Sequence, residues 1–455
     1  MKDTQAKHEL NLDQIITLLK EKDYEKFDEM FLDLHAYDQA QIFEKLNEYE
    51  RRAIYDVLSP EASADLFDML SEDVEELDVY FYEMDPEYAA HLLEHMYNDN
   101  TVDVLEHLDP EKRNELLALM DEESQVEITR MMSYGEDTAG SLLTTEFISL
   151  DEDLTTRETL ELMKEEGPDA ETIYYLYVVD SKKHLQGVVS LRDLVFSQPD
   201  ISLKEIMTKN IIRASVDDDQ EDVAHLIRDY DFLAVPVVNR QNQLVGIITV
   251  DDIVDVIDAK AAEDYSGLAA VDVDEKHDTP FSAAANRMPW LISLLVLGMG
   301  TSSLISFFEG MVSQLAILAV FISLITGTAG NAGTQSLAVA IRRISSREIK
   351  EDSHKIDFFL NELTVGILTG AAVGLAAFAI VGIWQRNLYL GIIVGTAMLF
   401  AVVVSTLAGS FVPILIEKLG FDPAVASGPF ITTLTDLTSV LIYFSIASLF
   451  LPYLT

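Results

Sequence analysis

The sequence predicts a multidomain membrane protein: a superhelical α-helical amino-terminal domain, a tandem pair of α/β domains, a connector helix and an all-α transmembrane domain of five helices. Three observations predict this fold class. Charge is concentrated in the front of the chain, since 69 of the 78 acidic and 23 of the 31 basic residues lie in the first 280 positions. An internal repeat occupies the middle. Five apolar stretches follow, and about 20 helical residues suffice to cross a bilayer.

The composition excludes several classes of function. The net charge is −47, so the soluble front repels nucleic acid and anionic lipid and attracts cations, divalent ions most strongly. There is no cysteine, which excludes thiolate nucleophiles and cysteine-based zinc sites. We find no nucleophile–base constellation and expect no enzyme. The first residues, MKDTQAKHELNLDQ, contain no apolar signal core, so we expect a cytoplasmic amino terminus.

Residues 1–135 read as short amphipathic helices. Three of the predicted helix starts share one pattern, in which a capping residue precedes proline and then an acid. The three starts are Ser59-Pro60-Glu61, Asp85-Pro86-Glu87 and Asp109-Pro110-Glu111. Their regular spacing predicts stacked helical hairpins in a small superhelical array.

Residues 136–258 contain two copies of one unit. The segment 177–194 pairs with 236–253 at a constant offset, and each copy reads as strand, turn, strand and a capped helix. The matched positions are Asp180 with Asn239, Gly187 with Gly246, Ser190 with Thr249 and Asp193 with Asp252. The repeat resembles a tandem pair of CBS domains, with boundaries at 136–200 and 201–258.

The last part of the chain changes from polar to apolar. Residues 259–288 read as a polar connector with a helix to about Tyr265. The domain 289–455 then contains the five membrane spans. We place these spans near 289–308, 314–341, 358–383, 388–415 and 424–454.

The loops between spans predict the orientation. The connection 342–355 carries five basic residues, whereas the next connection carries only Arg386. The positive-inside rule places the basic loop in the cytoplasm. We therefore expect a multi-pass protein of the cell membrane with a cytoplasmic amino terminus and an external carboxyl terminus.

Asp436 lies in the middle of the fifth apolar span. An ionised carboxylate in hydrocarbon costs several kcal/mol, so a carboxylate kept there usually lies on an ion path. The alternative is a protonated Asp satisfied by a neighbouring helix. Thr432, Thr433 and Ser439 share its helix face, and the second span carries a further polar stripe. That stripe consists of Thr328, Asn331 and Gln335.

One carboxylate cannot strip water from Mg²⁺, which usually keeps several of its waters. Two Asp436 side chains in a symmetric dimer would instead hold the hydrated ion through those waters. Soft metals are disfavoured because the membrane part has one histidine, His354, and no cysteine.

The order of domains and four motifs closely resemble the MgtE-type magnesium channels over essentially the full length. The motifs are GNAGTQS at 330–336, PFITTLTDLT at 429–438, DAETIYY around Glu171 and DYDF from Asp229. The resemblance implies a homodimer in the lipid bilayer. It also implies a Mg²⁺ pore that shuts when Mg²⁺ fills acidic sites between the cytoplasmic domains.

The resemblance also implies roles for individual residues. The pore residues are Asp436 and Thr432, with Gly428 offering its carbonyl and Asn331 on the facing helix. ATP is a candidate ligand of the CBS pair, at Arg192, Asp193 and Phe232. The gating acids that would bind Mg²⁺ are Asp99, Asp103, Glu221, Asp231, Asp252, Asp255, Glu263 and Asp264.

Two positions depart from the family pattern. Lys260 stands where an acid is frequent on the connector helix, and Gly428 stands where an Asn can precede the pore proline. Two alternative functions stay open at this point. One is a secondary transporter of Mg²⁺ or other divalent cations, and the other is a non-conducting membrane sensor that signals through the CBS pair.

Overall fold

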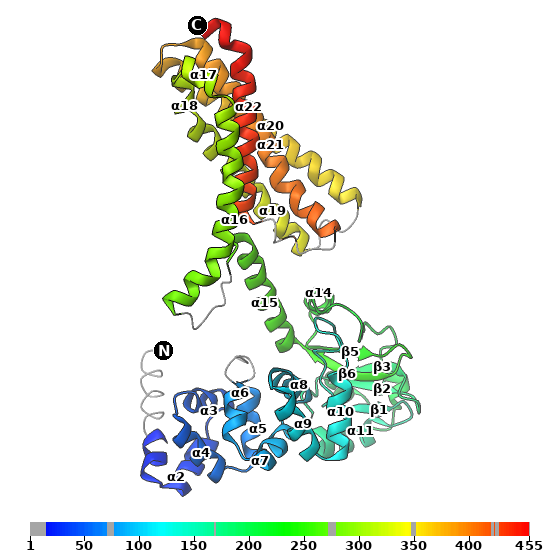
Figure 1. Cartoon of the computed structure of the whole chain (residues 1–455). Coiled ribbons are helices and arrows are strands. Elements are labelled where there is room, and N and C mark those ends of the chain that lie inside the picture. Colours follow the sequence, from blue (N-terminus) through cyan, green and yellow to red (C-terminus); the bar gives the residue numbers. More distant parts are fainter. Residues whose placement is uncertain are drawn as a thin grey trace, which may run out of the picture. The chain divides into compact units, whose positions relative to one another are not determined.

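The computed structural model describes residues 15–70, 77–167, 170–271, 279–346, 352–419, 423 and 427–454. The chain divides into two compact units, Met1–Ile257 and Asp258–Thr455. Figure 1 shows a helical array and two small sheets in the first unit, and long helices in the second.

The first unit begins with short helices. The three predicted helix starts are confirmed: Pro60, Pro86 and Pro110 open helices that Ser59, Asp85 and Asp109 cap through their side chains. Alternate helices pack together, as expected of stacked hairpins. The helices are α2 (Tyr24–Leu32), α3 (Ala36–Phe43), α4 (Glu48–Val57), α5 (Pro60–Asp68), α6 (Leu77–Glu83), α7 (Pro86–Leu93), α8 (Asn98–His107), α9 (Pro110–Leu119) and α10 (Glu122–Met131).

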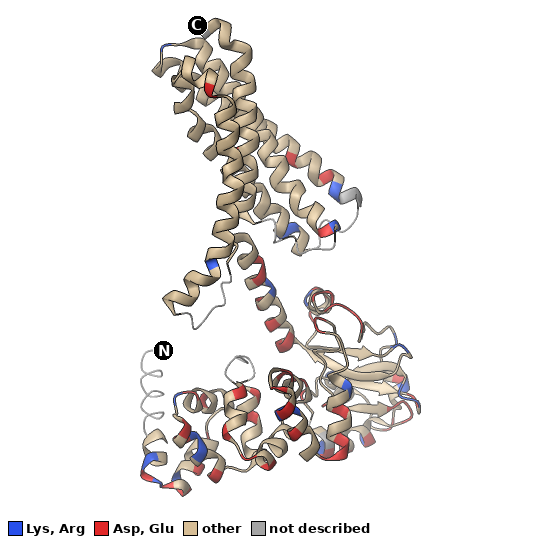
Figure 2. Ribbon diagram, in the orientation of Figure 1, with Lys and Arg blue, Asp and Glu red and all other residues tan. Residues whose placement is uncertain are grey.

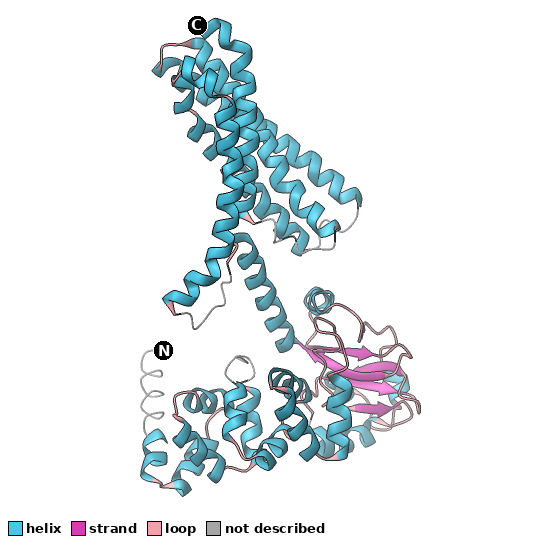
Figure 3. Cartoon of the chain, in the orientation of Figure 1, coloured by secondary structure: helices cyan, strands magenta, loops and turns pink. Residues whose placement is uncertain are grey.

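Two similar three-stranded sheets follow (Figure 3). In each sheet the first strand pairs in parallel with the second, and the second pairs antiparallel with the third. The first copy contains β1 (Ser149–Asp151), α11 (Thr156–Glu166), β2 (Tyr175–Val179), β3 (Leu185–Ser190) and α12 (Leu191–Phe196). Next come α13 (Leu203–Ile206), β4 (Ala214–Ser215), α14 (Gln220–Tyr230), β5 (Ala234–Val238) and β6 (Leu244–Thr249).

The predicted repeat extends to the irregularities of the two sheets. The register shifts between Val178 and Val179 in one copy and between Val237 and Val238 in the other. Gly246 lies opposite Val237, and a Cβ there would come within 2.7 Å of the Thr144 carbonyl oxygen. Only glycine lets the two segments approach this closely, so the repeated glycine has a packing reason.

The connector helix α15 (Val250–Ala269) is longer than the sequence indicated. It starts directly after β6, runs through the predicted boundary at 258 without interruption and continues past Tyr265. It ends with Ala270 in the left-handed conformation, at φ 56°. The Val271 and Ala270 N–H groups donate to the Ser266 and Gly267 carbonyls, which is the Schellman pattern.

Among the described residues of the second unit, five helices are long and apolar enough to cross a membrane. Figure 2 shows that charged residues are sparse along them. Short helices α17 (Glu309–Gln314) and α18 (Ile317–Val320) join the first of these helices to the second. The five long helices are α16 (Pro280–Phe307), α19 (Ile322–Ser345), α20 (Asp352–Trp384), α21 (Leu388–Lys418) and α22 (Gly428–Leu454).

The observed helices correspond to the five predicted spans, with the largest differences at the starts of the first two. Helix α19 begins at Ile322 rather than near 314, because α17 and α18 precede it. Helix α16 begins at Pro280 rather than near 289, because Thr279 caps it and proline is tolerated at the first helical position. Pro289 lies inside the helix. Part of the predicted basic loop, including Arg347 and Lys350, lies outside the described residues.

Candidate functional site

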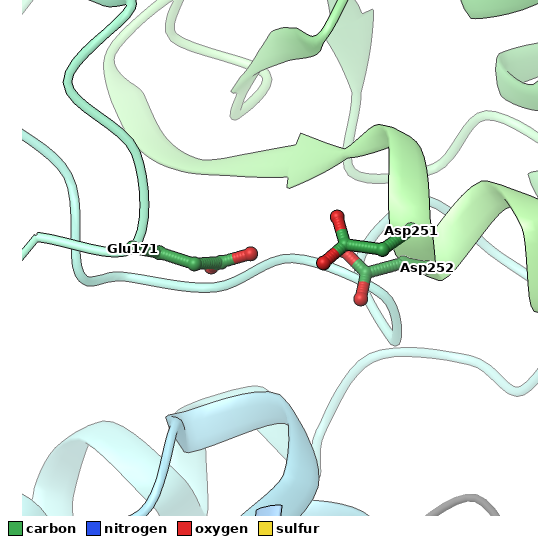
Figure 4. A group of neighbouring side chains, drawn as sticks. All are labelled: Glu171, Asp251 and Asp252. Carbon is green, nitrogen blue, oxygen red and sulfur yellow. The ribbon is translucent and has the colours of Figure 1, made fainter. Parts of the chain in front are cut away.

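Three carboxylates converge where the amino-terminal helices meet the CBS-like sheets. Glu171 lies in the loop before β2, and Asp251 and Asp252 lie in the first turn of α15. One carboxylate oxygen from each residue falls within 4.8 Å of the others. Figure 4 shows Asp251 and Asp252 side by side, with the Glu171 carboxylate directed toward them.

Local bonds hold these acids in place. Asp252 Oδ2 accepts hydrogen bonds from the Thr249 hydroxyl, at 2.7 Å, and from the Thr249 N–H, at 3.1 Å. The Glu171 N–H donates to the Glu146 carbonyl at 2.9 Å. Glu171 Oε2 is buried and has no hydrogen-bond partner among the described residues. The cluster therefore contains one carboxylate held by hydrogen bonds, that of Asp252, and one buried oxygen, Glu171 Oε2, with no hydrogen-bond partner among the described residues.

The α8 acids add to the charge of this cluster. Burial, followed by the charges of Asp252 and Glu171, raises the pKa of Asp99 well above its ordinary value. Burial, with smaller contributions from Glu106 and Asp252, raises the pKa of Asp103 to about 6. Burial and the Asp252 charge raise the pKa of Glu171 to about 8. The ionised acids thus repel one another in a poorly hydrated place.

A hard divalent cation fits this donor set. Carboxylate oxygens are the ligands that Mg²⁺ and Ca²⁺ prefer, and a cation between them would relieve the repulsion. Glu171, Asp251 and Asp252 would contact the ion directly or through water. Asp99 would face it from the amino-terminal helices.

The other predicted gating acids do not join this group within the described part of one chain. Glu221 lies in the first turn of α14 and Asp231 caps its other end. Glu263 forms an ion pair with Lys260 at 2.7 Å, so the unusual lysine neutralises a neighbouring acid. Asp264 accepts a hydrogen bond from Ser345 at 2.8 Å. Asp255 lies on α15 between these groups.

A cavity of about 190 Å³ opens between the two CBS-like repeats. Asp193 and Phe232 line it, together with Tyr175 and Tyr177, whereas Arg192 is not among its lining residues. The Ser190 hydroxyl donates to Asp193 Oδ2 at 2.7 Å and fixes that carboxylate. The aromatic side chains could stack on the base of a nucleotide, and the carboxylate could accept hydrogen bonds from its ribose hydroxyls.

Asp436 lies half-buried on α22. One turn earlier, the Thr432 hydroxyl donates to the carbonyls of Gly428, at 3.1 Å, and Pro429, at 2.8 Å. These carbonyls are therefore bonded within the helix rather than free. Ser439 is fully buried, so in one chain it packs against other helices and does not extend the polar stripe beside Asp436.

The polar stripe of α19 lies on an open face of the chain. Asn331 and Gln335 are exposed, whereas Gly330 is buried against Thr432 of α22. A Cβ on Gly330 would lie 3.3 Å from Thr432 Cγ2. Exposed amides on a membrane helix face water or protein rather than lipid, because hydrocarbon cannot satisfy them.

Family models cover most of the chain. Residues 34–137 match the MgtE intracellular N domain, 139–199 and 203–259 match the CBS domain, and 322–446 match the divalent cation transporter model MgtE. The magnesium transporter MgtE of Enterococcus faecalis is 53% identical over 96% of this chain and 97% of its own length.

The chain belongs to the MgtE family. It is a multi-pass membrane protein of that family, with the multidomain fold that the sequence predicted.

More distant MgtE proteins are also similar to this chain. The magnesium transporter MgtE of Thermus thermophilus is 40% identical over 71% of this chain and 72% of its own length. The soluble part of a magnesium transporter matches 56% of this chain and all of that structure, at 45% identity and a TM-score of 0.55. The cytosolic domain of the Mg²⁺ channel MgtE, solved with ATP, matches 54% of this chain and 99% of that structure, at 35% identity and a TM-score of 0.51.

Three acids of this MgtE chain are not among the candidate site residues that the sequence predicted. Glu171 was noticed only as part of a motif, and Asp251 was not singled out; the adjacent acids at 251 and 252 were the available signal. The third is Glu362 of α20, which is 7% exposed and accepts a 2.7 Å hydrogen bond from the Ser336 hydroxyl. A carboxylate within an apolar span was the signal there.

Proposed function

We propose that this protein is a homodimeric Mg²⁺ channel of the cytoplasmic membrane that closes when Mg²⁺ binds its cytoplasmic acids. The observation that carries the proposal is the convergence of Glu171, Asp251 and Asp252 beside Asp99, with an orphaned buried oxygen among them. The relatives named as magnesium transporters support the choice of ion.

The proposed pore lies between two copies of the chain. Asp436 would hold a hydrated Mg²⁺ through water, paired with Asp436 of the partner subunit, and Thr432 would line the path one turn away. The exposed Asn331 supports this arrangement, because a lipid-facing amide would be unsatisfied. The basic loop bias supports a cytoplasmic amino terminus and an external carboxyl terminus.

The proposed gate uses electrostatic repulsion. Without cation, ionised Asp99 on α8 and Asp252 on α15 repel each other and favour separation of the amino-terminal helices from the CBS pair. A bound Mg²⁺ cancels this repulsion and favours the closed arrangement, which is a population shift driven by differential affinity. We assign Asp103, Glu221, Asp231, Asp255, Glu263 and Asp264 to the same regulatory set.

We also propose that the CBS cavity binds ATP. Tyr175 and Phe232 would contact the base and Asp193 the ribose hydroxyls, with Arg192 outside the cavity wall. The ATP complex of the related cytosolic domain supports this assignment. For the domains we retain the boundaries 1–135, 136–200, 201–258, 259–288 and 289–455, with the connector helix starting inside the second CBS unit.

The pore assignment is tested by Asp436→Asn in liposomes loaded with a Mg²⁺-sensitive dye. We expect Mg²⁺ influx or its selectivity over Ca²⁺ to fall by about tenfold or more, because the charge that attracts the ion is gone. Gly298→Ala is a suitable control, since the added methyl would meet no atom of the described residues within 4 Å beyond the backbone of its own helix. If the Asp436→Asn variant conducts Mg²⁺ at the wild-type rate and with the wild-type selectivity, the assignment of Asp436 to the pore is refuted.

A further inference from the structure

The helical turn that carries Asp99 begins without a cap from its own N-cap residue. Helix α8 starts at Asn98, and the side chain of Tyr97 before it forms no capping hydrogen bond among the described residues. The first N–H groups of a helix have no partner within the helix, so they need one from elsewhere. Asp99 serves one of them, because its Oδ1 accepts the Asn100 N–H at 2.9 Å. Further support for this turn comes from other parts of the fold.

A carboxylate from a different helix supplies part of this support. Asp68 is the residue at which α5 ends, and its Oδ1 accepts the Tyr97 N–H at 3.1 Å and the Asn100 side-chain amide at 3.0 Å. The two donors flank Asp99 in the sequence, so one oxygen spans the turn that presents Asp99. A negative group near the amino end of a helix is also favourable, since that end carries a positive partial charge. Asp68 therefore acts as a cap supplied from α5.

Two further bonds hold the same turn. The Asn98 side-chain amide donates to the Thr145 hydroxyl at 2.6 Å, in the loop before β1. The Thr101 hydroxyl donates to the carbonyl of Leu93, the last residue of α7, at 2.9 Å. The start of α8 is thus bonded to α5, to α7 and to the loop before β1. These bonds set the direction of the Asp99 carboxylate, which is only 9% exposed.

We propose that Asp68 is a positioning residue for the candidate cation site, and that it holds the first turn of α8 so that Asp99 faces Glu171 and Asp252. The proposal rests on the proposed function, because it concerns the same sensor. In this role Asp68 does not touch the ion, and its Oδ1 is already engaged by two donors. Groups that orient the ligands of a metal change its affinity when they are removed, although they make no bond to it.

Two other roles for Asp68 make different predictions. If Asp68 contributed negative charge to the cation site, Asp68→Asn and Asp68→Ala would have the same effect. If Asp68 only stabilised the fold, neither variant would change the response to Mg²⁺. Positioning requires the acceptor oxygen, which Asn retains and Ala removes. The two variants therefore separate the three roles.

The test measures Mg²⁺ flux through the whole reconstituted chain against the Mg²⁺ concentration on its cytoplasmic side. In Asp68→Ala we expect the half-closing concentration to rise by about tenfold or more, with the flux at low Mg²⁺ unchanged. Asp68→Asn should close near the wild-type concentration. Asp65→Ala is the matched control, because Asp65 is an exposed acid on the same helix, and it should also close like wild type.

A double-mutant cycle shows whether Asp68 acts through Asp99. Asp99→Asn alone should raise the half-closing concentration, since it removes a charged group that faces the ion. Adding Asp68→Ala should then cause little further rise, because the turn that Asp68 holds no longer presents a carboxylate. If the two effects add independently, Asp68 acts elsewhere and the positioning role is overturned.

A second variant covers the case in which Asp68→Ala does not fold. Asn100→Ala removes one of the two bonds to Asp68 and keeps the carboxylate, and it should raise the half-closing concentration by a smaller factor. Closure of these alanine variants at the wild-type concentration, or equal shifts in Asp68→Ala and Asp68→Asn, would overturn the positioning role while the proposed function stood. Wild-type flux that Mg²⁺ never closes would instead refute the proposed gate, and the positioning role with it.

Discussion

Glu362 is a carboxylate in the core of the membrane domain, and at the scale of single residues it is the least expected feature. It is bonded to Ser336, which is itself 6% exposed, inside the GNAGTQS segment of α19. The sequence predicted Asp436 because an isolated acid in an apolar span is conspicuous. Glu362 was overlooked because it lies nearer the end of its span, where an exposed acid would be ordinary.

Replacing Glu362 should destabilise the membrane domain. In Glu362→Ala the Ser336 hydroxyl loses its acceptor in a buried place, which costs about 1–3 kcal/mol. Glu362→Gln keeps an acceptor and should lose less than half of that. Thermal unfolding of the detergent-solubilised protein measures the effect.

Glu417→Gln provides the comparison, since Glu417 forms a partly exposed ion pair with Lys355 and should contribute about 0–1 kcal/mol. Equal losses for the three variants would remove any special role of the Glu362–Ser336 pair.

The acid cluster predicts a pH dependence when Mg²⁺ is absent. The pKa of Glu171 is raised to about 8 and that of Asp252 to about 6, so the folded chain holds protons that the unfolded chain has released. Stability should therefore fall as pH rises from about 4 to about 8. Mg²⁺ replaces the protons and should flatten this slope.

Melting temperatures at pH 5 and pH 8, with and without Mg²⁺, check this. Glu171→Gln should also flatten the slope without Mg²⁺. If neither Mg²⁺ nor Glu171→Gln changes the dependence of the melting temperature on pH, then groups outside the acid cluster cause that dependence.

At the scale of elements, the sequence predicted the features that depend on neighbouring residues. The capped helix starts at Pro60, Pro86 and Pro110 and the repeat of β2–β3 in β5–β6 follow from residues close in sequence. The end of α15 did not, because Ala270 occupies the left-handed position that glycine usually marks. The proximity of Glu171 and Asp252 was also not predicted from the sequence, since only tertiary packing brings a loop of the first repeat to the start of α15.

The orientation of the membrane helices gives a further prediction. Arg386→Cys, after α20, should react with an impermeant maleimide applied outside intact cells. Ser346→Cys, at the end of α19, should react only after permeabilisation, because the positive-inside rule predicts that the basic loop stays in the cytoplasm. The cysteine-free wild type sets the background. The opposite labelling pattern would invert the topology.

At the scale of the whole molecule, an acidic unit and an apolar membrane unit share one continuous helix, α15. The sequence predicted both parts from the segregation of charge. It did not predict which acids lie close together in the fold. Of the eight predicted gating acids, only Asp252 belongs to the cluster of three carboxylates and only Asp99 lies beside it in the proposed site, which leaves six outside. We therefore assign the proposed cation sensing chiefly to Glu171, Asp251, Asp252 and Asp99.

The most direct test measures Mg²⁺ flux through the reconstituted protein against Mg²⁺ on its cytoplasmic side, for wild type and Glu171→Gln/Asp252→Asn. Asp200→Asn, at an exposed surface acid, is the matched control. Removing two of the converging carboxylates removes most of the differential affinity for Mg²⁺, so the half-closing concentration should rise by about tenfold or more. Wild type and Asp200→Asn should close together at the lower concentration. If the double variant closes with them, the acid cluster is not the sensor and the central claim fails.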